Sequence, residues 1–143
     1  MKMFEQTGEF TPDSLIASAD FPILKEGIGL KAGQGILKRG SLIIRSEKAG
    51  YIAGATITTG SGETAKTEEV KGKIFGILTD DTDTGTDAAG DNIPAVCYHT
   101  GVFNRDAVIV TGTDESGKNA TVDKYEDDMR DVSLFLRNVQ KYE

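Results

Sequence analysis

The side chains best suited to chemistry lie in the second half of the chain, where the single cysteine, Cys97, precedes the single histidine, His99, by two residues. Residues two apart on a strand point to the same face, so this thiol and imidazole could act as a nucleophile and its base. The sequence contains no motif for an orienting group or an oxyanion hole, and free cysteine is among the residue types most often buried. We therefore expect Cys97 to be structural and the chain to have no catalytic residue.

Acidic residues gather in the stretch DDTDTGTDAAGD, residues 80–91, which invites comparison with a calcium-binding loop. Gly85 and Asp91 would occupy the glycine and last-ligand positions of an EF-hand loop. Thr82 and Thr84, however, stand where that loop needs acidic side chains or Asn. Strand-like segments rather than helices flank the stretch. We expect a solvated acidic loop without a metal ion.

The remaining motifs do not indicate a cofactor. The stretch GIGLKAGQG, residues 27–35, has neither a dinucleotide-binding nor a Walker pattern, and its glycines adjoin strands rather than the start of a helix. One histidine and one cysteine are too few for a typical structural zinc site. We expect no cofactor and no bound metal.

The acidic balance of the chain limits its partners. The 143 residues suit one compact domain, and the net charge of −7 disfavours binding to nucleic acid. A locally positive stretch, residues 25–48, has no interleaved aromatic residues. We interpret it as a charged face for an acidic partner or for the 80–91 loop of a neighbouring copy. No segment is apolar for long enough to be a signal peptide or to span a membrane, so we expect synthesis in a cytoplasm and no membrane partner.

The elements that must position these residues are mostly strands. Short apolar or alternating segments, separated by Gly-rich turns, predict strands at residues 28–30, 36–37, 42–44, 51–58, 73–79, 93–99 and 107–111. Polar stretches predict surface loops at residues 59–72, 80–92 and 111–120. The pattern therefore predicts a mostly β domain.

The N-terminal residues differ from this β-rich part. In residues 1–20 the apolar side chains show neither a strand nor a helix period, and short polar residues separate them. This pattern indicates either a frayed end or a docking arm, ahead of a β-rich domain over residues 21–143.

The C-terminal segment carries a helical pattern. Its apolar stripe, which predicts an amphipathic helix over about residues 123–140, consists of Val132, Phe135, Leu136 and Val139. Acidic residues near the start of the segment and basic residues near its end suit the helix dipole. A strand through Val132, Leu134 and Leu136 is the competing interpretation.

Two long stretches together resemble the head decoration proteins of lambda-type tailed phages. The first is PDSLIASADFPILKEGIGLKAGQGILKRGSLI, residues 12–43, with a Leu-Ile pair, a Phe-Pro step, a strand ending in a Gly turn, and a Leu-Lys-Arg-Gly sequence. The second is GILTDDTDTGTDAAGDNIPAVCYHTGVFNRDAVIV, residues 76–110, with a Gly-Ile-Leu strand, a Thr/Asp loop and a Tyr-x-x-Gly-x-Phe strand pair. The motifs occur in the family's order. The loop at 59–72 and the C-terminal segment are longer than in the smallest family members.

The resemblance implies a β-barrel or tulip-like small domain with Gly-rich turns, a C-terminal helix and a flexible N-terminal arm. It also implies a non-enzymatic virion protein, made in the cytoplasm of a bacterial host. Family members bind the major capsid protein on the outside of the expanded capsid, as homotrimers at three-fold and quasi-three-fold positions. They stabilise the shell against the pressure of packaged DNA. Their arm becomes ordered on the capsid, where it can add to a sheet.

The resemblance, together with the isolation of apolar residues in the arm, assigns roles to individual residues. The expected capsid-binding residues of the arm are Phe10, Leu15, Ile16 and Phe21. The expected turn and core residues are Gly40, Gly76, Gly101 and Phe103. In this interpretation Gly101 allows a bend, Phe103 packs inward, and His99 has no chemical role.

Two other functions compete with capsid decoration. A small β-rich ligand- or carbohydrate-binding module usually carries aromatic platforms, whereas this chain has no Trp and its aromatic residues are scattered. A cysteine-dependent hydrolase would need Cys97 as its nucleophile. Both remain alternatives at this point.

Overall fold

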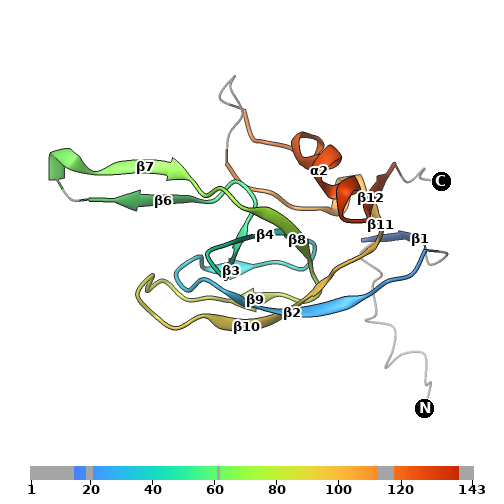
Figure 1. Ribbon diagram of the computed structural model, residues 1–143, viewed down its shortest axis with the longest axis horizontal. Coiled ribbons are helices and arrows are strands. Elements are labelled where there is room, and N and C mark those ends of the chain that lie inside the picture. The colour runs from blue at the N-terminus through green and yellow to red at the C-terminus, as the bar shows by residue number, and fades with distance from the viewer. Residues whose placement is uncertain (1–14, 19–20, 61, 113–117, 139–143) are drawn as a thin grey trace, which may run out of the picture.

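The computed structural model describes residues 15–18, 21–60, 62–112 and 118–138, and strands dominate this part of the chain (Figure 1). Its centre is a closed barrel of five strands. In order around the barrel these are β10 (Ile93–Tyr98), β2 (Lys25–Leu30), β5 (Ala49–Ile52), β4 (Leu42–Ser46) and β8 (Lys73–Leu78). The predicted mostly β fold with a barrel and a C-terminal helix is confirmed.

A three-stranded sheet packs on one side of the barrel. β11 (Gly101–Asn104) is its central strand, with β1 (Ile16–Ser18) antiparallel on one side and β12 (Leu134–Arg137) parallel on the other. The 3₁₀-helix η3 (Val122–Tyr125) and the helix α2 (Glu126–Asp131) lead into β12. Another 3₁₀-helix, η2 (Arg105–Ala107), follows β11.

Two small β-ribbons complete the described part. β3 (Ile36–Leu37) pairs with β9 (Thr82–Asp83) in the acidic loop. β6 (Thr56–Thr59) and β7 (Lys66–Glu69) form a hairpin, with the short helix η1 (Gly62–Thr64) near its tip. The loop expected at residues 59–72 is therefore largely a hairpin. The strand expected at 51–58 is split into β5 and β6 by a turn at Gly54, which has a φ of 91°.

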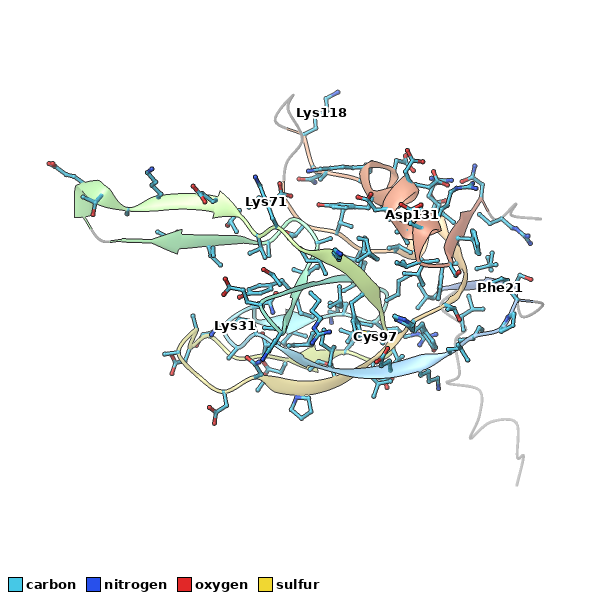
Figure 2. The ribbon with its side chains drawn as sticks, in the orientation of Figure 1. Phe21, Lys31, Lys71, Cys97, Lys118 and Asp131 are labelled. Atoms are coloured by element: carbon cyan, nitrogen blue, oxygen red, sulfur yellow. The ribbon has the colours of Figure 1, made fainter. Side chains whose placement is uncertain are left out.

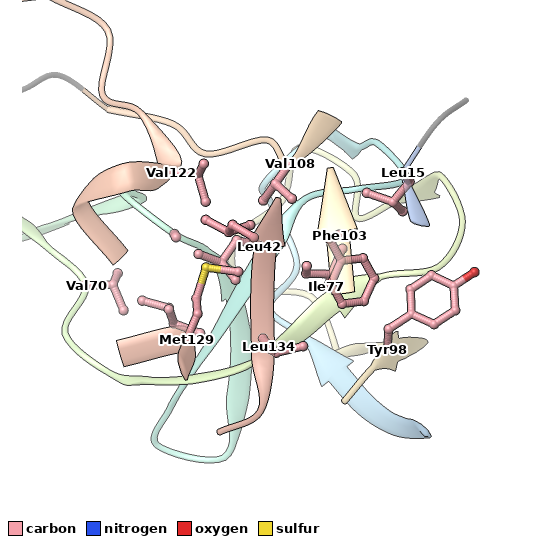
Figure 3. Packing of buried hydrophobic residues seen from close by; sticks show 13 residues of the cluster. Leu15, Leu42, Val70, Ile77, Tyr98, Phe103, Val108, Val122, Met129 and Leu134 are labelled. Carbon is pink, nitrogen blue, oxygen red and sulfur yellow. The ribbon is translucent and has the colours of Figure 1, made fainter. Parts of the chain in front are cut away.

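The barrel strands separate two apolar cores. Leu42 and Ile44 of β4 point into a core shared with the three-stranded sheet and α2, which we call the inter-layer core (Figure 3). Ile43 points into the barrel core, with Leu30 and Cys97 among its neighbours. A strand buried on both faces must be apolar at consecutive positions, which explains the runs LII in β4 and IFGIL in β8.

The C-terminal helix expected over about residues 123–140 was wrong in extent. Helical backbone ends at Asp131, Ser133 adopts a φ of 66°, and the chain continues as β12. Leu134 and Leu136 are buried in the inter-layer core, so the competing strand pattern is the one realised there. The free edge of β11 offers backbone hydrogen bonds that outweigh the local helical pattern. Val139 lies outside the described residues.

The strand expected at 107–111 is also reduced. Within that stretch the backbone makes one isolated bridge, between Ser41 and Ile109.

Gly76 allows β8 and β10 to approach closely. A Cβ atom at this position would lie 2.4 Å from the carbonyl oxygen of Tyr98, which is backbone and cannot move aside. At Gly27 on β2, by contrast, a Cβ would lie 3.7 Å from the Ala95 carbonyl oxygen, an ordinary contact.

Gly76→Ala is expected to lower the free energy of unfolding by about 1–3 kcal/mol, because the added methyl group overpacks the barrel wall. Gly27→Ala is the matched control and should leave it unchanged or slightly higher, since alanine restricts the unfolded chain more than glycine does. Urea denaturation measures both. Equal effects of the two substitutions would contradict the close approach at Gly76.

Candidate functional site

The N-terminal segment enters the domain as the edge strand of the three-stranded sheet. The carbonyl oxygen of Leu15 accepts a hydrogen bond of 2.8 Å from the backbone N–H of Asn104. The Leu15 side chain is 1% exposed and lies in the inter-layer core beside Phe103 (Figure 3). Leu15 is thus held within its own domain, whereas the sequence suggested an arm residue that reaches a partner.

Ile16 is the expected arm residue that stays accessible. It is opposite Phe103 in the β1–β11 pairing, and its side chain is 36% exposed. Within the described part of the chain β1 pairs only with β11, which makes it an edge strand of its sheet. An edge strand can accept a further strand from a partner.

The two expected phenylalanines of the arm, Phe21 and Phe10, differ because the structure describes only Phe21. The ring of Phe21 meets that of Phe135 on β12 edge-to-face, with 5.2 Å between centroids, so Phe21 covers the outer side of the sheet. Phe10 lies outside the described residues. Of the four expected arm residues, the structure brings Leu15, Ile16 and Phe21 to one sheet.

Three of the four expected turn and core residues lie around the same sheet, whereas Gly76 lies in the barrel on β8. Gly40 has a φ of 97°, and a Cβ there would lie 2.7 Å from the Ala107 carbonyl oxygen. Gly101, with a φ of 150°, begins β11 and accommodates the Phe103 ring, which would lie 2.9 Å from a Cβ at 101. Phe103 itself is fully buried. These contacts hold β11 against the barrel and so position β1 beside it.

An ion-pair cluster around Arg105 fixes the other side of the sheet. Its guanidinium makes two hydrogen bonds of 2.8 Å to the carboxylate of Glu126 and a further bond to Asp123. Its Nε donates to the side-chain oxygen of Asn138. The cluster links η2 to α2 and to the end of β12. Sequence analysis did not find these contacts, because the partners are distant in the chain and no periodic pattern joins them.

These contacts change the proton affinities of both partners. The Glu126 and Asp123 hydrogen bonds raise the pKa of Arg105, which stays charged. The Arg105 hydrogen bond is the main cause that lowers the pKa of Glu126 below its ordinary value of 4.5. A bidentate pair of this type fixes geometry as well as contributing energy.

The thiol and imidazole singled out by the sequence do not form a nucleophilic pair. Cys97 is fully buried in the barrel core, and burial raises the pKa of its thiol to about 12. His99 turns its Nδ1 to the Phe75 carbonyl oxygen at 2.9 Å, which makes that nitrogen a donor. A thiol that remains protonated at neutral pH is a poor nucleophile.

The acidic loop uses its carboxylates to shape its own backbone. Asp83 accepts a hydrogen bond from the N–H of Gly85, and Asp87 accepts one from Ala89. Asp81 accepts one from the N–H of Arg39. Among the residues that the structure describes, no group of three or more His, Cys, Asp or Glu side chains is arranged to hold a metal ion.

A groove of about 410 Å³ lies between residues 105–110 and 120–123. Arg105 and Asp123 provide its charged walls, and Val108 and Ile109 provide apolar ones. None of the described residues that line it is aromatic, whereas carbohydrate sites usually present aromatic platforms. The groove thus gives no support to a carbohydrate-binding module.

Comparisons with known proteins leave the family open. No protein-family model matches the chain, and a search of curated proteins found no match. None of the helices in the described residues is both long enough and apolar enough to cross a membrane.

The Glu126 pKa gives a testable pH dependence. Because this pKa is lower in the folded protein, the Arg105–Glu126 pair stabilises the fold above pH 4.5, and this contribution is lost as the pH falls through the lowered pKa. Glu126→Gln should therefore be less stable than wild type at neutral pH and approach it in acid. Glu63→Gln, at the exposed hairpin tip, is the control and should behave as wild type. A Glu126→Gln deficit in urea denaturation that is the same at every pH would contradict the role of this carboxylate.

Proposed function

We propose that this chain is a head decoration protein of a tailed phage. In this role it binds the outer surface of the expanded capsid as trimers and stabilises the shell against the pressure of packaged DNA. It is a structural protein of the virion whose partners are the major capsid protein and further copies of itself. It catalyses no reaction, in line with the buried, protonated thiol of Cys97.

The observation that carries the proposal is the position of β1. This strand lies at the edge of the three-stranded sheet, and its register is fixed by buried Leu15 while Ile16 remains exposed. A chain that enters its domain through an anchored edge strand can extend a sheet with a strand of a partner. The capsid protein would supply that strand.

The anchoring of Leu15 matters for the mechanism. A mechanical load on the N-terminal segment would pass through the β1–β11 pairing into the inter-layer core, where the buried side chain of Leu15 resists it. The Arg105 cluster ties the far side of the same sheet to α2. The sheet is therefore suited to transmit tension between the capsid surface and the barrel.

Trimer formation would strengthen such a contact. Three linked segments bind at high effective concentration, so each can contribute modest affinity while the whole remains firmly attached. A closed three-fold arrangement also lets one surface of a copy meet a different surface of the next.

The test is co-sedimentation with undecorated expanded capsids of the phage that encodes the protein. Deletion of residues 1–14 leaves Leu15 in place and should preserve folding but abolish binding. Ile16→Asp, which puts a charge at the open edge of β1, should weaken binding at least tenfold, equivalent to about 1.4 kcal/mol. Ile36→Asp is the control, since Ile36 is 61% exposed on β3, and should bind as wild type.

Full binding by both the protein lacking residues 1–14 and the Ile16→Asp variant would contradict the proposal that β1 and the segment before it bind the capsid. Circular dichroism and urea denaturation establish that each variant is folded before its binding is compared.

A further inference from the structure

The β6–β7 hairpin stands away from the rest of the molecule (Figure 1). In the described part of the chain β6 pairs only with β7, and all the side chains described in both strands are exposed (Figure 2). At its base, the carboxylate of Glu69 accepts hydrogen bonds from Lys124 and Tyr125. Two-stranded hairpins with so little packing are marginally stable in water. Such an element is expected to have a partner.

The hairpin is nevertheless well defined. At its root Val70 is buried, and its N–H donates to the Ala55 carbonyl oxygen at 2.8 Å. Midway, the hydroxyl groups of Thr58 and Thr67 lie 2.8 Å apart and form a hydrogen bond. Near the tip, Gly60 has a φ of 83°, which suits a tight turn. The hairpin thus presents a regular strand edge.

Its two edges differ in charge. β6 has the sequence TITT, which is uncharged and β-branched throughout, and Ile57 is 44% exposed. β7 has the sequence KTEE, in which three of four residues are charged. Charged residues at an exposed edge prevent unwanted strand pairing, and β6 lacks them. Its composition favours pairing instead.

We propose that β6 pairs antiparallel with β6 of a second copy of this chain. The two hairpins then form one sheet in the order β7–β6–β6–β7, related by a two-fold axis. The charge pattern selects this partner, because two uncharged β6 edges meet without repulsion. Pairing through β7 would place three charged side chains of each copy at the contact, and charged residues at a strand edge disfavour such pairing. Ile57 becomes covered by the neighbouring strand.

This contact goes beyond the proposed function. A two-fold contact joins two copies and cannot close a ring of three, so between decoration trimers it would link one trimer to the next. It uses neither Ile16 nor the segment before it. The experiment below is done without capsids, so its outcome is independent of capsid binding.

Disulfide trapping tests the contact directly, with matched controls from the facing strand. Thr58 is opposite Thr67 and Ile57 is opposite Glu68, so each pair differs mainly in which edge it lies on. Cysteines would be introduced singly at these four positions. Directly opposed residues of paired strands have Cα atoms about 4.5–5.5 Å apart, which suits a disulfide. Cys97 is buried and gives little background.

The β6 variants Ile57→Cys and Thr58→Cys should form disulfide-linked dimers several-fold faster than Glu68→Cys and Thr67→Cys. At least one β6 position must exceed its control when the two-fold axis lies at Ile57 or Thr58, and the lysine variants below test the other registers. Equal rates for both edges, or faster linking through β7, would overturn the proposal.

A second pair of variants measures association without covalent trapping. Thr58→Lys and Thr67→Lys remove the same hydroxyl–hydroxyl hydrogen bond and add the same charge, so their effects on hairpin stability should match. In sedimentation velocity over a concentration series, Thr58→Lys should lose the self-association that Thr67→Lys retains. Loss in both, or in neither, would argue against pairing through β6.

Discussion

The pairing of β4 with β8 is the interaction on which the rest of the structure depends. These strands form one wall of the closed barrel and, with their other faces, the floor beneath the three-stranded sheet. Ile43 fills the barrel core while Leu42 and Ile44 fill the inter-layer core. Because both faces are buried, a shift of register by one residue would exchange the side chains of the two cores. The register of β4 and β8 therefore determines where β11, and with it β1, can lie.

Strand positions could be predicted from the sequence where the local residue pattern agrees with the burial of the strand in the folded protein. The run KIFGILT predicted β8, and Ile93 correctly marked the start of β10, since apolar and turn-forming residues specify such strands locally. The C-terminal segment was not predictable in this way. The apolar stripe that predicted a helix begins at Val132, whereas the helical backbone ends at Asp131. Beyond that residue the unpaired edge of β11 decides the conformation, and a single segment carries no information about that edge.

In the candidate site, too, local features were predictable from the sequence and features set by contacts distant in the chain were not. The sequence indicated an apolar N-terminal segment but not that Leu15 belongs to the core while Ile16 stays exposed, because that difference arises from the β1–β11 pairing. Cys97 lies buried in the barrel core, a position typical of free cysteine, which behaves as a small apolar side chain. The Arg105 cluster depends on contacts between residues far apart in the chain, which composition and spacing do not encode.

In the proposed function one anchored edge strand takes the load and two apolar cores resist it. This mechanism is tested most directly by heating DNA-filled capsids with and without saturating protein and following DNA release with an intercalating dye. We predict that bound protein raises the temperature of release, and that protein lacking residues 1–14 does not. Release at the same temperature, with the intact protein shown to be bound, would contradict a stabilising role on the capsid.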